Sequence, residues 1–263
     1  MKNIPIYQVD AFAGRLFKGN PAAVCVLEEW LPEVVMQAIA AENNLAETAF
    51  VVADGGDFSI RWFTPSVEVD LCGHATLAAA HVLLNEMGID RNKLMFSSRR
   101  RGVLSVARDG DRLALDFPAD TISRISTPAV LIEALGVEPL ETYKGGTDIM
   151  AVLPSEKYVA ALKPDIGMLA TLDVRGIIVT AEGTTADFVS RFFGPQSGID
   201  EDPVTGSAHT TMTPYWAKEL NKKSLFARQI SSRGGELWCQ DRGDRVGISG
   251  HAVTYMSGTL KLI

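Results

Sequence analysis

The feature that most constrains the fold of this chain is an internal repeat with an interval of roughly half its length. Segment 61–65 (RWFTP) is matched by segment 191–195 (RFFGP), 130 residues later. Segment 73–75 (GHA) is matched by segment 206–208 (GSA), 133 residues later. In both copies a strand-like segment, a proline and an acidic loop precede a glycine and a helix. Solenoid repeats are much shorter, so the pattern predicts duplication of a whole domain, although either block alone could arise by chance.

The hydrophobic pattern predicts strands and helices on both sides of the repeat. Apolar and polar residues alternate in short segments such as 58–63 and 112–117, which is typical of strands with one buried face. Segment 75–87 is apolar nearly all round, which predicts a buried helix. A second helix is expected over 210–220, where Pro214 costs about 3 kcal/mol unless the local geometry adapts. The polar stretch 118–127 is interpreted as a linker between domains.

Composition excludes several classes of function. The 263 residues carry a net charge of −7, which argues against a nucleic-acid partner, since such proteins usually present a basic face. No apolar run approaches membrane-spanning length, and the N-terminal segment MKNIPIYQVDAFA has no continuous apolar signal core, so no membrane association is expected. The three cysteines, Cys25, Cys72 and Cys239, match no zinc or redox spacing and suit no simple disulfide framework. The cytoplasm is therefore the expected compartment.

The two repeated glycines mark candidate anion-binding positions. Gly73 and Gly206 each stand at the start of a predicted helix, where the first backbone N–H groups have no partner within the helix. Duplicated domains could aim two such helix starts into one cleft, with a carboxylate between them. Ser207 could add its hydroxyl group to this binding site. The sequence has no Walker loop, no dinucleotide-binding motif and no nucleophile elbow around Ser207.

Five motifs together resemble one known family, the phenazine-biosynthesis isomerase (PhzF-like) family, which shares its fold with diaminopimelate epimerase. The motifs are DAF at 10–12, GNPA at 19–22, NLAETAF at 44–50, CGHAT at 72–76 and DPVTGSAH at 202–209. The resemblance implies an α+β fold of two pseudo-symmetric domains, each a curled mixed β-sheet, or half-barrel, around a central helix. The domains would comprise residues 1–117, with a strand at about 254–263 returning to them, and residues 118–253. The active site would lie in the cleft between the domains. Family members are commonly homodimers and use neither a cofactor nor a metal.

The resemblance also assigns roles to three titratable residues. Read alone, Glu47 is a cap or surface group, but it matches the family's acid/base glutamate. The implied activity is that of a cofactor-independent isomerase that moves a proton between carbons of a small carboxylate, with His74 and Asp202 assisting. Read alone, His74 is a hydrogen-bonding residue at a helix start, and Asp202 is an acid that favours the helix dipole. Gly73, Gly206 and Ser207 would bind the substrate. Asp200 and Glu201 are expected to stay solvated.

Two alternatives remain open. A two-base epimerase or racemase of the same fold would use Cys72 with a second cysteine, but the repeat places Thr205 at the second position, so Cys72 is interpreted as a small buried residue. A non-catalytic small-molecule-binding protein would keep the binding site without turnover. No metal is expected, because His74, His81, His209 and His251 show no ligand pairing. His209 could face the core or the cleft.

Overall fold

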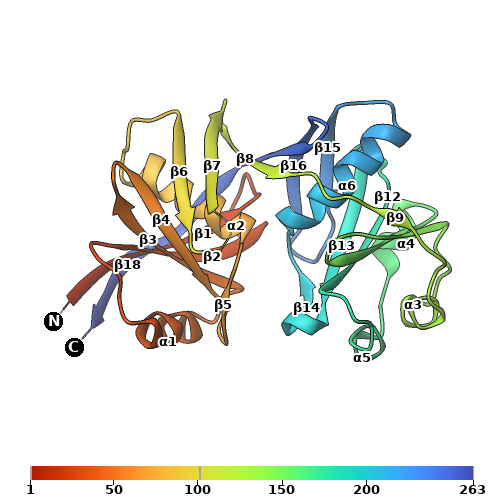
Figure 1. Cartoon of the computed structure of the whole chain (residues 1–263), viewed down its shortest axis with the longest axis horizontal. Coiled ribbons are helices and arrows are strands. Elements are labelled where there is room, and N and C mark those ends of the chain that lie inside the picture. The colour runs from red at the N-terminus through yellow and green to blue at the C-terminus, as the bar shows by residue number, and fades with distance from the viewer. Residues whose placement is uncertain (1, 101, 263) are drawn as a thin grey trace. The chain divides into compact units, whose positions relative to one another are not determined.

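The computed structural model describes residues 2–100 and 102–262. Residues 1, 101 and 263 lie outside this description, and with them the last residue of the strand expected at 254–263. The chain divides into two compact units, which we call unit 1 (Met1–Asp116 with Ser249–Ile263) and unit 2 (Phe117–Ile248). Figure 1 follows the chain through both units by colour.

Unit 1 is a curled, mixed β-sheet around one buried helix, α2 (Gly73–His81) (Figure 1). The helix contacts β1, β2, β3, β7 and β18, strands from both ends of the sequence, so the sheet wraps around it. The order across the sheet is β18, β1, β2, β3, β4, β6, β7 and β8, with β5 beside β4. The β2–β3 and β4–β6 pairs are parallel and the others antiparallel. The elements besides α2 are β1 (Lys2–Ala11), β2 (Asn20–Leu27), α1 (Glu33–Asn43), β3 (Glu47–Asp54), β4 (Asp57–Phe63), β5 (Glu68–Val69), β6 (Lys93–Ser98), β7 (Gly102–Asp109), β8 (Arg112–Pro118) and β18 (Ala252–Leu262).

Helix α2 is buried because its sequence offers no polar face. Every residue from His74 to His81 is buried, and four of them are alanines, which let the strands approach the helix closely. The predicted helix over 75–87 thus starts two residues earlier and ends at His81. It is followed by a wider π-helical turn, Val82–Glu86, closed by the N–H of Met87 donating to the carbonyl of Val82 at 2.9 Å.

Unit 2 repeats this arrangement around α6 (Gly206–Glu219), which contacts β11, β15 and β16. The β11–β12 and β13–β15 pairs are parallel, whereas β12–β13 and β15–β16 are antiparallel. Unit 1 has the same sequence of pairings in β2–β3, β3–β4, β4–β6 and β6–β7. The structure therefore confirms the predicted duplication. The elements besides α6 are β9 (Ser123–Arg124), α3 (Ala129–Leu135), β10 (Glu141–Lys144), β11 (Asp148–Val152), α4 (Glu156–Ala161), α5 (Ile166–Leu169), β12 (Gly176–Glu182), β13 (Phe188–Gly194), β14 (Ile199–Asp202), β15 (Ser224–Gln229), β16 (Gly235–Asp241) and β17 (Arg245–Gly250).

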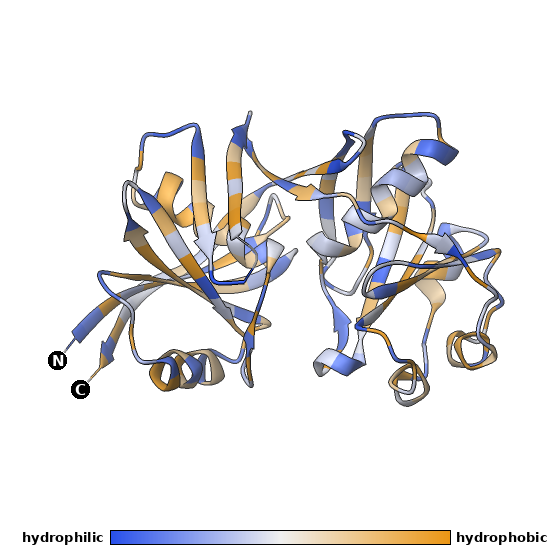
Figure 2. Cartoon of the chain, viewed as in Figure 1, coloured by the Kyte–Doolittle hydropathy of each residue, from blue (hydrophilic) through white to orange (hydrophobic). Residues whose placement is uncertain are grey.

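The alternating strand patterns predicted from the sequence correspond to alternating burial. In β8 the apolar residues Leu113, Leu115 and Phe117 are buried, whereas the residues between them are partly exposed. Figure 2 shows apolar and polar residues alternating along strands of both units. No helix among the described residues has both the length and the apolar character that crossing a bilayer requires.

The two units contain matching arginine–glutamate ion pairs. Arg61 on β4 donates to both carboxylate oxygens of Glu68 at 2.6 Å, and Arg191 on β13 donates to both oxygens of Glu201 at 2.7 and 2.8 Å. Each bidentate pair ties a strand to the segment that leads into α2 or α6, and such pairs fix geometry as well as charge. The expectation that Glu201 stays solvated is therefore wrong, whereas Asp200 is exposed as expected.

Helix α6 accommodates its internal proline by a hydrogen bond from outside the helix. Pro214 has no N–H group, so the carbonyl of Thr210, four residues earlier, loses its usual helical partner. The backbone N–H of Asp120 donates to that carbonyl at 3.2 Å. The helix consequently runs through Pro214 to Glu219.

Candidate active site

Glu47 is the first residue of β3, immediately after the turn that ends α1. That turn passes through Asn44, whose left-handed backbone (φ 48°, ψ 37°) lets its N–H group donate to the carbonyl of Ala40 at 3.2 Å. Asparagine tolerates this conformation better than most residues. The parallel register then sets Glu47 opposite Ala22 of β2, and its side chain is only 13% exposed. The motif at 44–50 thus places one carboxylate at the start of a buried strand.

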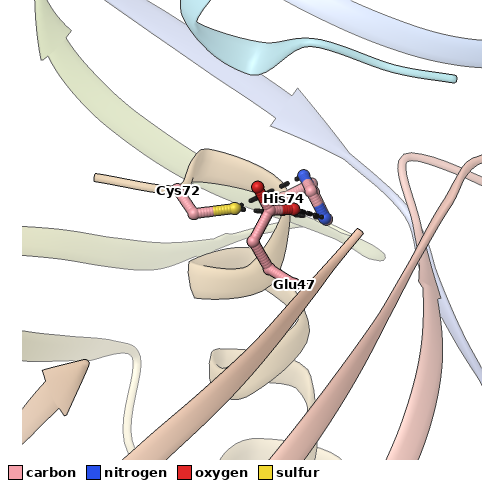
Figure 3. A group of neighbouring side chains, drawn as sticks. All are labelled: Glu47, Cys72 and His74. Atoms are coloured by element: carbon pink, nitrogen blue, oxygen red, sulfur yellow. Dashed lines mark hydrogen bonds and ion pairs between the residues drawn. The ribbon is translucent and has the colours of Figure 1, made fainter. Parts of the chain in front are cut away.

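The start of α2 brings His74 against this carboxylate. Nε2 of His74 lies 3.1 Å from Oε2 of Glu47, and Figure 3 shows the two side chains pointing toward one another. On the other side of the ring, Nδ2 of Asn20 lies 3.2 Å from Nδ1 of His74. The Asn20 amide therefore contacts the ring nitrogen that does not face Glu47. Asn20 was not predicted as a site residue, although the GNPA motif at 19–22 contains it.

The electrostatics of the pair favour a proton between the two residues. Burial of His74 opposes its protonation, but the neighbouring Glu47 carboxylate favours the charged ring and holds the pKa of His74 above its ordinary value. Both side chains are largely shielded from water, with exposed fractions of 6% and 13%. A carboxylate beside an imidazole in such surroundings is suited to proton transfer.

Cys72 completes this cluster as a neutral thiol. Its Sγ lies 3.5 Å from Nδ1 and 3.9 Å from Nε2 of His74. Burial, followed by the negative charge of Glu47, raises the pKa of Cys72 to about 11, and a protonated thiol cannot act as a base. Cys72 is the N-cap of α2, and the residue at the N-cap of α6 is Thr205. The second thiol of a two-base epimerase is therefore replaced by a hydroxyl at the matching position.

In unit 2, Asp202 is held by the residue that caps α6. It is buried at the end of β14, and Oγ1 of Thr205 donates to its Oδ2 at 2.5 Å. Gln229 is hydrogen-bonded to both residues. Its Nε2 donates to the carbonyl of Asp202 and its Oε1 accepts a hydrogen bond from the N–H of Thr205, each at 2.8 Å. No sequence motif pointed to Gln229, the last residue of β15.

Ser207 is oriented by an arginine that the sequence did not single out. Nη1 of Arg175 donates to Oγ of Ser207 at 3.0 Å, and its Nε donates to Oδ1 of Asp148 at 2.9 Å. Nη2 of Arg175 also donates to the second oxygen of Asp148, which is buried. The guanidinium carbon lies 5.3 Å from the ring centroid of Phe192. Because Oγ of Ser207 accepts from a cation, its own hydrogen can point to another acceptor.

The two repeats differ at the position of the acid. In β3, Glu47 lies two residues before Ala49, which pairs with Trp62 of β4. In β12, Gly176 lies two residues before Ile178, which pairs with Phe192 of β13. Trp62 and Phe192 are matching positions of the repeat, so Glu47 and Gly176 match as well. A Cβ atom at Gly176 would lie 2.2 Å from Cζ of Phe192, so the ring occupies the space that a side chain would need. Unit 1 therefore has a carboxylate at this position and unit 2 has none, and the residue before Gly176 is Arg175.

His209 faces the core of unit 2, which decides between the two orientations left open by the sequence. It is fully buried, its Nδ1 lies 2.9 Å from the carbonyl oxygen of Thr205, and its ring centroid lies 5.8 Å from that of Phe188. Burial lowers the pKa of His209 to about 4, so the imidazole is neutral near pH 7 and donates from Nδ1. A neutral core histidine explains this residue without a role in proton transfer.

The two glycines predicted to bind the substrate lie at helix starts, as expected. Gly73 and Gly206 are the first residues of α2 and α6. Among the described residues, the side chains of Glu47, Cys72 and His74 form a group with ligand atoms close enough for one metal ion, all within 4.8 Å of one another. The His-pair spacing used for the sequence prediction does not detect this mixed group.

Comparison with known proteins places the chain in a family. An uncharacterized isomerase of Pseudomonas aeruginosa is 54% identical over 98% of this chain and 99% of its own length. The crystal structure of a phenazine biosynthesis PhzF family protein from Enterococcus faecalis is 49% identical and matches with a TM-score of 0.96, covering 99% of this chain and 100% of that one.

A more distant match supports the fold alone. A hydroxyproline epimerase from Agrobacterium vitis is 12% identical and has a TM-score of 0.62, covering 98% of this chain and 92% of that one. The fold is thus α+β and similar to that of this epimerase, in agreement with the diaminopimelate epimerase-like fold that the sequence motifs implied. The family model for phenazine biosynthesis-like proteins matches residues 9–258. The chain therefore belongs to the phenazine biosynthesis-like protein family.

Proposed function

We propose that this protein is an isomerase that moves a proton between two carbons of a small carboxylate, with Glu47 as the acid/base group. The observation that carries the proposal is the buried contact of 3.1 Å between Glu47 and His74. The isomerase name of the Pseudomonas aeruginosa relative supports the reaction class. The substrate class is cyclic or unsaturated and derived from an amino acid.

The proposed reaction begins with proton abstraction by Glu47. Its Oε1 takes the proton from a carbon next to the carboxylate or to the unsaturated system, and the electron pair of that C–H bond delocalises into this system. His74, which faces Oε2, keeps the carboxylate oriented and balances the change in its charge. Protonated Glu47, whose carboxyl proton exchanges with solvent, then delivers a proton to a second carbon of the same substrate. No proton is gained or lost overall, so the reaction requires no co-reactant.

The residues of unit 2 are proposed to bind the substrate. Ser207 donates its hydroxyl hydrogen to the substrate carboxylate while Arg175 holds the serine oxygen at 3.0 Å. The backbone N–H groups after Gly206 and Gly73 add further donors at helix starts. Asp202, fixed by Thr205, accepts a hydrogen bond from a polar group of the substrate. Arg175 is a positioning residue in this scheme, because it acts through Ser207.

Two alternatives make different predictions. A cysteine-dependent epimerase would lose activity on thiol alkylation, whereas the proposed isomerase does not use the thiol as a base. A binding protein without turnover would be stabilised by a ligand and would catalyse no proton exchange with any ligand. The test of the proposal is to incubate candidate unsaturated carboxylates with the protein in deuterated water and to follow deuterium incorporation into carbon by NMR. Deuterium uptake that depends on Glu47 supports the proposal, and uptake that survives Glu47→Gln refutes the role of this residue.

A further inference from the structure

The indole of Trp62 on β4 is a buried hydrogen-bond donor that the chain itself leaves unused. The side chain is 2% exposed, and its Nε1 has no hydrogen-bond partner among the described residues. Buried polar groups are nearly always paired, because an unpaired donor gives up its hydrogen bonds with water and receives none in return. The buried indole of Trp216 in unit 2, for example, donates to Oγ1 of Thr180 at 2.9 Å. The unpaired N–H of Trp62 therefore indicates an acceptor that comes from outside the chain.

The strand register places Trp62 beside the proposed acid/base residue. Trp62 pairs with Ala49 of β3, and Glu47 lies two residues before Ala49. Side chains at paired positions, and at positions two residues apart, lie on the same face of a sheet. Glu47 contacts His74 of α2 from this face, so the Trp62 side chain also points toward α2. The opposite face carries Phe63, which belongs to a cluster with buried residues of α1.

Unit 2 shows how far an aromatic side chain reaches at this position. Phe192 matches Trp62, and its Cζ lies 2.2 Å from the place where a Cβ atom of Gly176 would be. Gly176 matches Glu47, so an aromatic side chain on this strand extends diagonally across the sheet to the position of the acid. The carboxylate and the indole N–H both occur at these positions in unit 1, and unit 2 has neither.

We propose that Trp62 is a substrate-binding residue whose indole N–H donates a hydrogen bond to an oxygen of the substrate beside Glu47. An indole nitrogen only donates, so its partner is an acceptor such as a carboxylate or carbonyl oxygen, and not an ammonium group. The chemical role rests on the proposed function, in which Glu47 takes a proton from carbon. As the electron pair of that C–H bond delocalises onto a conjugated oxygen, negative charge develops there, and a fixed donor stabilises it. Trp62 therefore contributes to kcat, whereas Ser207 contributes to substrate binding.

The binding test observes the indole N–H directly by NMR. The chain has four tryptophans, and in protein labelled with ¹⁵N the Trp62 signal is the one that Trp62→Phe removes. Titration with benzoate, a cyclic unsaturated carboxylate, should shift the Trp62 proton signal downfield, because the N–H gains an oxygen acceptor. The signal of Trp238, on β16 of unit 2, should stay in place. A Trp62 signal that does not move during the titration would overturn the proposal.

The kinetic test compares two tryptophan variants by deuterium uptake into the substrate carbon. Trp62→Phe removes the N–H donor and introduces the aromatic residue that unit 2 has at the matching position. We expect kcat to fall about 10- to 100-fold with a smaller change in KM, because a hydrogen bond to a developing charge is lost. Trp238→Phe is the control and should leave both constants unchanged. A wild-type kcat in folded Trp62→Phe would refute the contribution of Trp62 to the reaction.

These measurements separate the role of Trp62 from the proposed function. The titration detects a hydrogen bond and requires no turnover, so its result does not depend on proton exchange. An unmoved Trp62 signal in a protein that exchanges protons refutes the role of Trp62 alone, whereas exchange that survives Glu47→Gln refutes the role of Glu47. The titration uses wild-type protein, so it stays decisive if Trp62→Phe fails to fold: the proposal is wrong if none of the four indole signals moves.

Discussion

The neutral core histidine His209 predicts a specific loss of stability in acid. Its ordinary pKa of 6.5 falls to about 4 in the folded protein because the ring is buried, whereas the unfolded chain keeps the ordinary value. Between these two values the unfolded state binds a proton that the folded state does not, so stability falls as the pH is lowered from 6.5 to 4. A difference of 2.5 pKa units corresponds to about 3 kcal/mol at one group.

The measurement compares denaturant unfolding of wild type and His209→Leu between pH 7 and pH 4. The leucine has no titrating group, so its curve carries only the contributions of the other residues. We expect wild type to lose about 3 kcal/mol more than the variant over this range. The lost hydrogen bond to Thr205 lowers the stability of the variant by about the same amount across this pH range, so it does not alter the comparison. Parallel curves, or an NMR titration of His209 near pH 6.5, would refute the reasoning.

Two further predictions follow from the geometry of unit 2. Ser207→Ala should raise the KM of the isomerase about 10- to 100-fold with a smaller effect on kcat, because a hydrogen bond to a charged group contributes about 1.5–3 kcal/mol. Arg175→Met should also raise KM, and Arg175→Lys should raise it less. Steady-state kinetics in which KM stays at its wild-type value in all three variants would argue against this binding role. Gly176→Ala should lower the free energy of unfolding by about 1–3 kcal/mol because its Cβ would meet the ring of Phe192, whereas Gly258→Ala, where the nearest atom is 3.9 Å away, should cost less. Equal denaturation midpoints for these two variants would contradict the packing argument.

Much of the fold was predictable because the duplication repeats the proline and glycine positions that end a strand and begin a helix, as well as the hydrophobic pattern. The helices expected over 75–87 and 210–220 begin slightly earlier, at Gly73 and Gly206, and the buried character of α2 follows from its lack of a polar face. The segment 156–169 forms two short helices, α4 and α5, and not one continuous helix. Pro164 lies between them, and proline disfavours a helical conformation in the residue before it.

The predicted site was less complete than the predicted fold. Asn20, Arg175 and Gln229 each contact a site residue that is distant in the sequence. Asn20 lies in the GNPA motif, whereas Arg175 and Gln229 have no local pattern that signals their contacts. The solvated role expected for Glu201 was wrong because its partner, Arg191, lies ten residues earlier on a neighbouring strand. The homodimer and the cytoplasmic location expected from the sequence stay predictions.

The most direct test of the central claim is the rate of deuterium uptake from solvent into a substrate carbon by Glu47→Gln. The amide keeps the shape of the side chain and removes its basic oxygen, so we expect the rate to fall about 10²- to 10⁴-fold. Glu42→Gln, which changes an exposed glutamate near the end of α1, should leave the rate unchanged. Unfolding midpoints measured in parallel exclude loss of the fold as the cause. Uptake that continues at the wild-type rate in Glu47→Gln would contradict the account.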